Sequence, residues 1–327
     1  MRYLFFLLPL LAFSGLRAQQ TEPGATPAAV AGKRILADFP SSRPLTINYQ
    51  QSFGRDFSSE LNGENFRGGT VDGQQRVSVG LNLPVYYRPK MLVTTALNYT
   101  YDKLSFNDFN NLNGDSATEP GGFDYYSAGF NVVHFNKLFG KPLTLAGGVL
   151  LDGGNDGIQR VKGSASGILT MVDNERTKFS LGLVAIIDPT SQLPFAPIVR
   201  YEHQFKNSPY TLDVVLPSRM LIRRHIGTRS RLSVGTTFGG NGYYVNVEQP
   251  DFSQDYEYSQ LELNTGLIYE YKVSKSVILT ARGGLTSFLS NRLTEKGEPN
   301  RDFIYRNEQG STGYFGVGLS WNPFAKR

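Results

Sequence analysis

One stretch, residues 76–87, limits what this chain can fold into, because apolar residues alternate there with polar, small or proline residues. The apolar members are Val77, Val79, Leu81, Leu83 and Val85. A period of two places the two sets on opposite faces of one β-strand. Such a strand separates two media: in a soluble sandwich its apolar face packs on a second sheet, and in a membrane barrel that face contacts lipid while the other lines the lumen.

The same alternation recurs from residue 45 onward. We predict strands at residues 45–58, 74–87, 91–106, 123–137, 142–151, 158–172, 177–188, 195–205, 210–216, 219–226, 230–247, 256–273, 276–291 and 310–321. About 14 strands is an even number, as single-chain bacterial barrels require. Residues 217–218 form either a tight hairpin or a kink, and if the segments beside them do not span the membrane the count falls to about 12. No stretch has a helical period with caps, so almost no helix is expected.

The connections between the strands alternate in length. The short ones are residues 88–90, 138–141, 173–176, 206–209, 227–229 and 274–275. Several of the alternate links are long and polar, namely residues 60–73, 107–122 and 292–309. Short periplasmic turns and long extracellular loops are typical of outer-membrane barrels. The predicted fold is therefore all-β: a transmembrane, antiparallel, up-and-down β-barrel with both termini in the periplasm.

Aromatic residues gather toward strand ends rather than strand centres. Near the short turns lie Tyr86, Tyr87, Phe135, Phe139, Phe205, Tyr210, Tyr271 and Trp321. Toward the long loops lie Tyr99, Tyr101, Phe106, Tyr125, Tyr126, Phe195, Tyr243, Tyr244, Tyr256 and Tyr258. Two belts around an aliphatic band are typical of membrane proteins. Aromatic residues favour strands in general, but that preference predicts no bias toward strand ends, so the belts favour a barrel over a soluble β-sandwich.

The N-terminus has the pattern of an export signal. Arg2 is followed by a nearly continuous apolar run through residues 4–13 and by Ala18 at a cleavage point. We predict a cleaved signal peptide at residues 1–18, a flexible periplasmic segment rich in Thr, Ala and Pro at residues 19–44, and the barrel at residues 45–327. Within the periplasmic segment, residues 33–40 are the part that could dock locally.

Composition restricts the classes of function. The chain has no Cys, so no disulfide stabilises it. Without residues 1–18 the formal net charge falls from +5 to +3, because Arg2 and Arg17 are removed. A nearly balanced chain with scattered basic residues argues against nucleic-acid binding, which needs a clustered basic patch. We expect a monomer that contacts outer-membrane lipid, requires the outer-membrane assembly machinery during biogenesis and carries no cofactor.

The end of the chain carries a family resemblance. Its last strand alternates Phe315, Val317, Leu319 and Trp321, and residues 322–327 follow it. This ending, the Ala-Gln junction at residues 18–19 and the Leu-Pro-Ser-Arg step at residues 216–219 resemble a family of uncharacterised outer-membrane β-barrel proteins of Bacteroidetes-type, Gram-negative bacteria. The resemblance covers residues 45–324 and implies the fold and an outer-membrane location. The family has no assigned chemistry, so the resemblance implies no site residue.

Two patterns could indicate chemistry, and both have a simpler interpretation. His134, His203 and His225 all lie near short periplasmic turns, whereas outer-membrane lipid hydrolases and proteases work at the outer leaflet. We interpret them as interfacial histidines and predict no catalytic residue. Residues 152–157 are oxygen-rich like a calcium loop but lack its ligand spacing. A tight hairpin with Gly at positive φ explains them better, and no metal site is predicted.

The most informative residues are charges on the face predicted to line the lumen. The lumen-lining candidates are Arg76, Lys162, Arg200, Glu202, Arg231, Glu262 and Arg282, with Asp213, Arg223, Glu270 and Lys272 on the same face. A buried charge is costly alone, so these either pair across strands as a salt-bridge lattice or line an aqueous path. Because their signs are mixed, strong selectivity for anions or cations is not expected.

Two functions fit this fold best. The first is a porin-like passive channel for small or amphipathic solutes, because a barrel of this size can hold a lumen wider than its side chains fill. The second is a closed barrel that acts as a surface scaffold or binding module through residues 60–73, 107–122 and 292–309. A membrane enzyme is disfavoured by the positions of the histidines.

Overall fold

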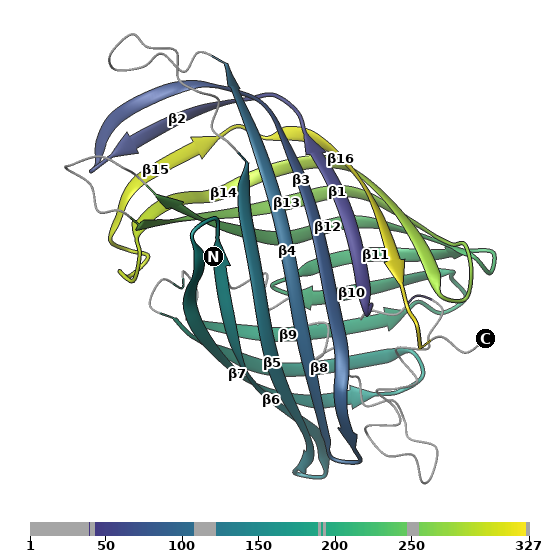
Figure 1. Cartoon of the computed structure of the whole chain (residues 1–327). Coiled ribbons are helices and arrows are strands. Elements are labelled where there is room, and N and C mark those ends of the chain that lie inside the picture. Colours follow the sequence, from purple (N-terminus) through teal and green to yellow (C-terminus); the bar gives the residue numbers. More distant parts are fainter. Residues whose placement is uncertain are drawn as a thin grey trace.

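The alternating stretches of the sequence form strands that join into one antiparallel sheet (Figure 1). The computed structural model describes residues 39, 43–107, 122–188, 191, 194–246 and 255–324. The strands are β1 Leu45–Ser52, β2 Arg55–Leu61, β3 Glu64–Arg88, β4 Met91–Asn107, β5 Phe123–Leu138, β6 Lys141–Gly154, β7 Gly157–Asp173, β8 Thr177–Ile187, β9 Phe195–Gln204, β10 Tyr210–Leu216, β11 Arg219–Ile226, β12 Ser230–Asn246, β13 Asp255–Lys272, β14 Val277–Glu295, β15 Phe303–Gln309 and β16 Thr312–Trp321. Within these residues, no helix is long and apolar enough to cross a membrane.

The sheet closes into a barrel through its first and last strands. β1 and β2 both pair with β3 and are separated only by Phe53 and Gly54, so they are one strand with a break. β15 and β16 both pair with β14 and are broken in the same way at Gly310 and Ser311. β1 pairs with β16, and β2 pairs with β15. The result is a closed barrel of 14 strands, which confirms the predicted fold.

The residues around Pro217 decide the strand count. β10 and β11 pair with each other across a tight hairpin, and each also pairs with its outer neighbour, β9 or β12. Both segments therefore belong to the barrel wall, and the alternative of about 12 strands is wrong.

Two of the three long loops expected from the sequence are largely strands. Residues 60–73 form a hairpin in which β2 and β3 meet at Asn62 and Gly63, whose φ angles of 52° and 83° fit the type I′ turn that Asn-Gly favours. Residues 292–309 mostly belong to β14 and β15. Figure 1 shows β2 and β15 side by side at one end of the barrel. The third predicted loop, residues 107–122, lies almost wholly outside the described residues.

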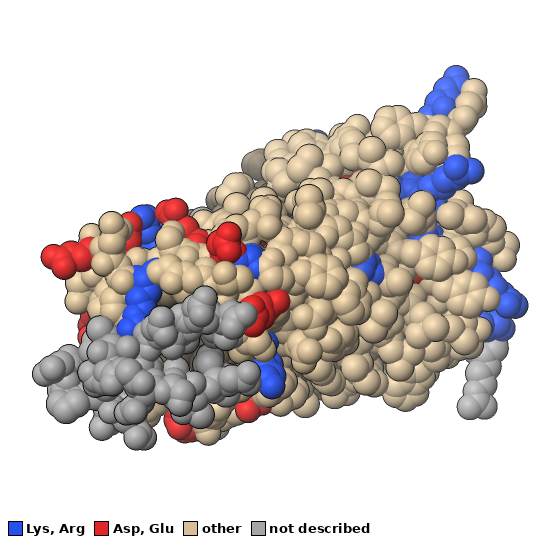
Figure 2. All heavy atoms as spheres, turned by 90° about the horizontal axis from the view of Figure 1, so that it is seen from above, with Lys and Arg blue, Asp and Glu red and all other residues tan. Residues whose placement is uncertain are grey.

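The outward face of the barrel is apolar across its middle. Val77, Leu145, Leu183 and Leu279 are all exposed, Leu183 to 66%. Figure 2 shows charged side chains gathered toward the two ends of the molecule, with a broad band of uncharged residues between them. Water-facing surfaces rarely expose so large an apolar area, so this band is the lipid-facing surface expected of a membrane barrel. The described strands form one closed sheet, which excludes the sandwich.

The prediction of two aromatic belts is only partly right. Near the short turns, the exposed members of the predicted belt are Tyr86, Tyr87, Phe139, Phe205, Tyr210, Tyr271 and Trp321, whereas Phe135 is buried. From the opposite belt, the buried residues are Tyr125, Tyr243, Tyr244 and Tyr256. The assignment of these four tyrosines to the lipid interface is wrong, because they point into the barrel.

The wall of the barrel is uneven in height. β10 and β11 contain 7 and 8 residues, whereas β7 and β12 contain 17 each. A membrane-spanning strand needs roughly 9–11 residues, so the β10–β11 hairpin ends low in the wall. On β12, the last residue paired with β11 is Thr237. Beyond it, β12 is held by β13 alone among its neighbours in the described sheet.

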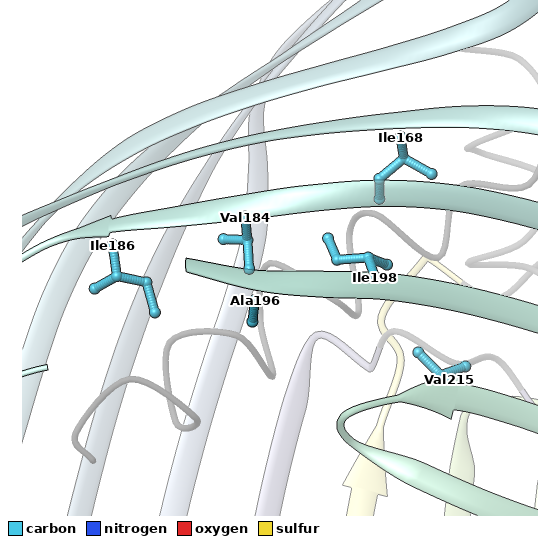
Figure 3. Close-up of a cluster of buried hydrophobic side chains, with 6 residues drawn as sticks. All are labelled: Ile168, Val184, Ile186, Ala196, Ile198 and Val215. Atoms are coloured by element: carbon cyan, nitrogen blue, oxygen red, sulfur yellow. The ribbon is translucent and has the colours of Figure 1, made fainter. Parts of the chain in front are cut away.

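One sector of the inner surface is packed with apolar side chains. Figure 3 shows this buried cluster on β7 to β10, which consists of Ile168, Val184, Ile186, Ala196, Ile198 and Val215. These side chains are packed as in the core of a soluble protein. The inner face is therefore not polar throughout, and its charged groups lie elsewhere.

Candidate functional site

The upper part of β12 stays paired with β13 but bends inward across one end of the barrel, opposite the termini, which the sequence predicts to be the extracellular mouth. Residues 240–244 are all buried, whereas a strand in a barrel wall exposes alternate residues. This stretch packs against β5 and β6, which are not neighbours of β12 in the sheet. Gly154 at the end of β6 lies beside Tyr244, since a Cβ added there would lie 3.4 Å from Cβ of Tyr244.

A first polar network, centred on Asp102 of β4, holds β12 in this position. Asp102 is completely buried, and its Oδ2 accepts from Nε of Arg76 at 2.8 Å and from the hydroxyl of Tyr243. Arg76 also donates to Oε1 of Glu262 at 2.9 Å. In the amide orientation that satisfies both groups, Asn241 accepts from the two terminal nitrogens of Arg76 at 2.9 and 2.8 Å. Residues from β3, β4, β12 and β13 are thereby joined across the lumen.

A second polar network fastens Tyr244 to the opposite wall. Asp152 of β6 accepts hydrogen bonds from Tyr244 at 3.0 Å and from Tyr125 at 2.9 Å. Lys162 of β7 lies 2.6 Å from Asp152, 3.4 Å from Asp188 and 3.8 Å from Glu257. The last two carboxylates also pair with Arg160, at 3.2 and 3.1 Å respectively.

The two networks together close the extracellular mouth. Removing water from a charge costs several kcal/mol, and only close partners with good geometry repay it. Here the charged groups have such partners, and aromatic contact adds to them, since Phe123 of β5 stacks on Tyr243 with ring centroids 5.4 Å apart. The closure is therefore held by specific side-chain contacts between strands on opposite sides of the barrel.

At the periplasmic end, residues just before β1 enter the lumen. Phe39 is buried, and the centroids of its ring and the His225 ring are 5.7 Å apart. Cζ of Arg231 lies 4.8 Å from the centroid of the Phe39 ring. Arg43 pairs with Glu270 and donates to Oγ of Ser320 at 3.1 Å. The prediction that residues 33–40 could dock is thus supported at Phe39, the only one of them that the structure describes.

Between these two closures lies a cavity of about 470 Å³. Phe39 and Arg43 line its periplasmic end, and Arg76, Asn241 and Glu262 line the end that faces the Asp102 network. A cavity of this size is in the range that small-molecule ligands occupy. The described part of the lumen is therefore not completely filled by a salt-bridge lattice.

The seven predicted lumen residues divide into three groups. Arg76, Arg231, Glu262 and Arg282 line the cavity. Lys162 lies in the second network at the mouth. Arg200 and Glu202 on β9 are half-buried and are not among the described residues that line the cavity.

Several important residues were missed by the sequence reasoning. Asp102, Asp188 and Glu257 were not proposed, and Asp152 was interpreted only as part of a hairpin. That hairpin is real: β6 and β7 meet at a two-residue turn, and Gly157 has a φ of 93°. The missed carboxylates lie beside basic residues on neighbouring strands, and the alternating parity of β4 could have placed Asp102 on the inner face.

No metal centre or histidine-based catalytic site is evident in the described part of the chain. No group of three or more His, Cys, Asp and Glu residues there could hold a metal ion. His134 is exposed, His203 contacts Thr177, and His225 contacts Phe39. All three lie near short turns, so they remain best interpreted as residues of the periplasmic end.

Comparison with known proteins gives a family and several solved structures. The sequence model of a domain of unknown function, DUF6268, matches residues 62–322. No curated protein matches the chain. Among solved structures, an outer-membrane channel of Pseudomonas putida F1 has a TM-score of 0.36 and 11% identity over 85% of this chain and 95% of its own. Outer-membrane phospholipase A of Escherichia coli has a TM-score of 0.30 and 16% identity over 84% of this chain and 93% of its own. A Pseudomonas aeruginosa FadL homologue has a TM-score of 0.28 and 8% identity over 89% of this chain and 96% of its own.

Proposed function

Because the chain belongs to the family of the DUF6268 domain, whose function is unknown, its relatives supply no activity, and we propose from its geometry that it is an outer-membrane channel for small or amphipathic solutes. The observation that carries this proposal is the 470 Å³ cavity inside the barrel. A purely structural barrel of this width gains stability by filling its interior, because empty polar space leaves charges without partners.

Features of the closures support a gated channel. The upper part of β12, still paired with β13, covers the mouth, and at the periplasmic end Phe39 and Arg43 contact side chains of the lumen. Both closures depend on side-chain contacts, so each can open without unpairing the barrel. The low β10–β11 hairpin reaches the upper part of the cavity, because Ser218 and Arg219 line it. An amphipathic solute that enters near this hairpin would avoid the sealed mouth.

The experiment is a flux assay with the full mature chain in phospholipid vesicles. The vesicles are loaded with benzenesulfonate, benzyltrimethylammonium or raffinose; the first two are small, permanently charged and amphipathic, and the third is a larger neutral sugar. We expect at least one aromatic ion to leave much faster than from protein-free vesicles while raffinose stays inside. If all three stay inside although the barrel is folded by heat-modifiable gel migration, the channel proposal is wrong.

A second candidate, the scaffold, is favoured by one observation. β2, β3, β14 and β15 continue the sheet beyond the break in the first and last strands, and they carry exposed side chains such as Phe66. A projecting sheet of this kind offers a rigid surface for a partner. The same flux assay separates the two candidates, since a scaffold retains every solute even when either closure is removed by mutation.

A further inference from the structure

The charges that line the cavity on the periplasmic side of the Asp102 network are not balanced. Five guanidinium groups lie there, those of Arg43, Arg219, Arg223, Arg231 and Arg282. Two carboxylates pair with them: Asp213 pairs with Arg219 and Arg223, and Glu270 pairs with Arg43 and Arg231. Each carboxylate is thus shared by two arginines, and the described residues leave a positive excess.

Two of these arginines have unused capacity to donate hydrogen bonds. Among the described residues, Arg282 donates a hydrogen bond of 3.2 Å from Nη2 to the neutral amide oxygen Oδ1 of Asn48. Nε of Arg223 is buried and has no hydrogen-bond partner among the described residues. A guanidinium offers five N–H donors in a planar fork that suits carboxylate, sulfonate or phosphate oxygens.

Neighbouring charges do not cancel this excess. Glu202 on β9 lies in register with Lys178 on β8 and with Asp213 on β10. Lys178 and Arg200, which share its face of the wall, together carry more positive charge than Glu202 carries negative charge. Glu262 lies at the far end of the cavity and pairs with Arg76. Asp102 pairs with the same arginine. The extracellular end of the cavity therefore holds more negative charge than the periplasmic end, and the field inside the cavity points an anion toward Arg223 and Arg282.

Apolar groups share the lining with these arginines. The ring of Phe39 and the side chains of Leu221, Phe238 and Ile268 all line the cavity. An anion with a compact apolar body would match this mixture, because the body would contact these side chains while the charged group meets the guanidinium groups.

We propose that the cavity is a binding site for amphipathic monoanions, in which Arg223 and Arg282 contact the anionic group and Phe39, Leu221 and Ile268 contact the apolar body. The inference deepens the proposed function and rests on it for its biological meaning, because it names the class of solute that the channel takes. Uncompensated positive charge in a partly dehydrated site favours an anion strongly over a cation of equal size. This replaces the expectation from the sequence that mixed signs give no strong selectivity.

The test measures binding directly, without requiring transport. The full mature protein in detergent is titrated calorimetrically with benzenesulfonate and, as the matched cation, benzyltrimethylammonium. We expect saturable binding of the sulfonate at least ten-fold tighter than binding of the cation. Arg282→Gln and Arg223→Gln should each weaken sulfonate binding roughly ten-fold or more, since each removes a charge-assisted hydrogen bond. Arg282→Lys should retain part of the affinity.

Arg224→Gln is the matched control, because Arg224 is the next residue on β11, is exposed, and contacts Tyr210 on the outside. It should bind sulfonate as the wild type does. Equal binding of the cation, or unchanged affinity in both inner variants, would overturn the inference. The binding site and the channel can fail separately. If the protein binds the sulfonate but releases no solute from vesicles, the binding site is supported and the transport proposal is wrong. If both ions leave the vesicles and bind equally well, transport is supported and the anion site is wrong.

Discussion

The two ends of the lumen hold charged groups in different ways. At the extracellular end, Arg76 pairs with two carboxylates, those of Asp102 and Glu262, and the hydroxyl of Tyr243 donates a further hydrogen bond to Asp102. At the periplasmic end, Arg282 has an asparagine in place of a carboxylate. The first arrangement holds a strand across the mouth, and the second leaves positive charge facing a cavity. The difference separates charges that stabilise the fold from charges that are available to a ligand.

The largest expected effect comes from removing the arginine of the extracellular end. Arg76→Gln leaves Asp102 and Glu262 buried without their cation, and the cost of breaking a buried pair in this way is about 3–5 kcal/mol. Arg282→Gln is the control at the other end and should change stability by less than about 1 kcal/mol, because no carboxylate loses a partner. Urea unfolding of the protein in lipid vesicles measures both. Equal losses in the two variants would remove the distinction between the ends.

A smaller loss is expected at Lys162, which is 4% exposed and lies between three carboxylates. Lys162→Met should cost about 3 kcal/mol, because Asp152, Asp188 and Glu257 then each lose one buried cation. Lys296→Met removes a more exposed pair with Asp255 and should cost at most about 1 kcal/mol. The same unfolding measurement applies, and a loss at Lys162 no greater than at Lys296 would show that the second network does not stabilise the closure.

The periplasmic closure should be weaker than the extracellular one. Phe39→Ala removes the contacts of the ring with Arg231 and His225, and a cation–π or aromatic contact of this kind contributes about 1–2 kcal/mol. We expect a small loss of stability and faster release of benzenesulfonate from vesicles. Phe139→Ala, a change at an exposed turn residue, serves as the control. Unchanged release in the Phe39 variant would mean that this residue does not restrict the cavity.

The smallest effect is expected outside both closures. Glu60 of β2 and Arg306 of β15 pair at 3.0 Å, and each side chain is more than a third exposed. Glu60→Gln should alter stability by less than about 1 kcal/mol and leave flux unchanged. A large loss in the free energy of unfolding would show instead that the pairing of β2 with β15 stabilises the closed barrel.

The strands were predictable because lipid imposes a period of two on every segment that it touches. This is why residues 76–87 and their counterparts were placed correctly. Where the sheet leaves the lipid, as in residues 62–73, both faces are polar and the period fades, so the hairpin was taken for a loop although Asn62-Gly63 carried a turn signal.

The site was less predictable because it depends on contacts across the barrel. Tyr243 and Asp102 are 141 residues apart in sequence and on strands that are not neighbours. The parity rule states which side of the wall a residue faces, and it identified Arg76, Glu262 and Arg282. It does not state that β12 will bend into the lumen, since that depends on the short β10 and β11 beside it. The docking of Phe39 likewise depends on where Arg231 and His225 meet in space.

The most direct test of the account is the single-channel current of the doubly substituted protein, Arg76→Gln with Phe39→Ala, in planar lipid bilayers. Because two closures made of side chains enclose one continuous cavity, we predict stable conductance steps in the double variant that exceed those of the wild type and of either single variant. A double variant that is folded and inserted but conducts no more than the wild type would contradict this prediction.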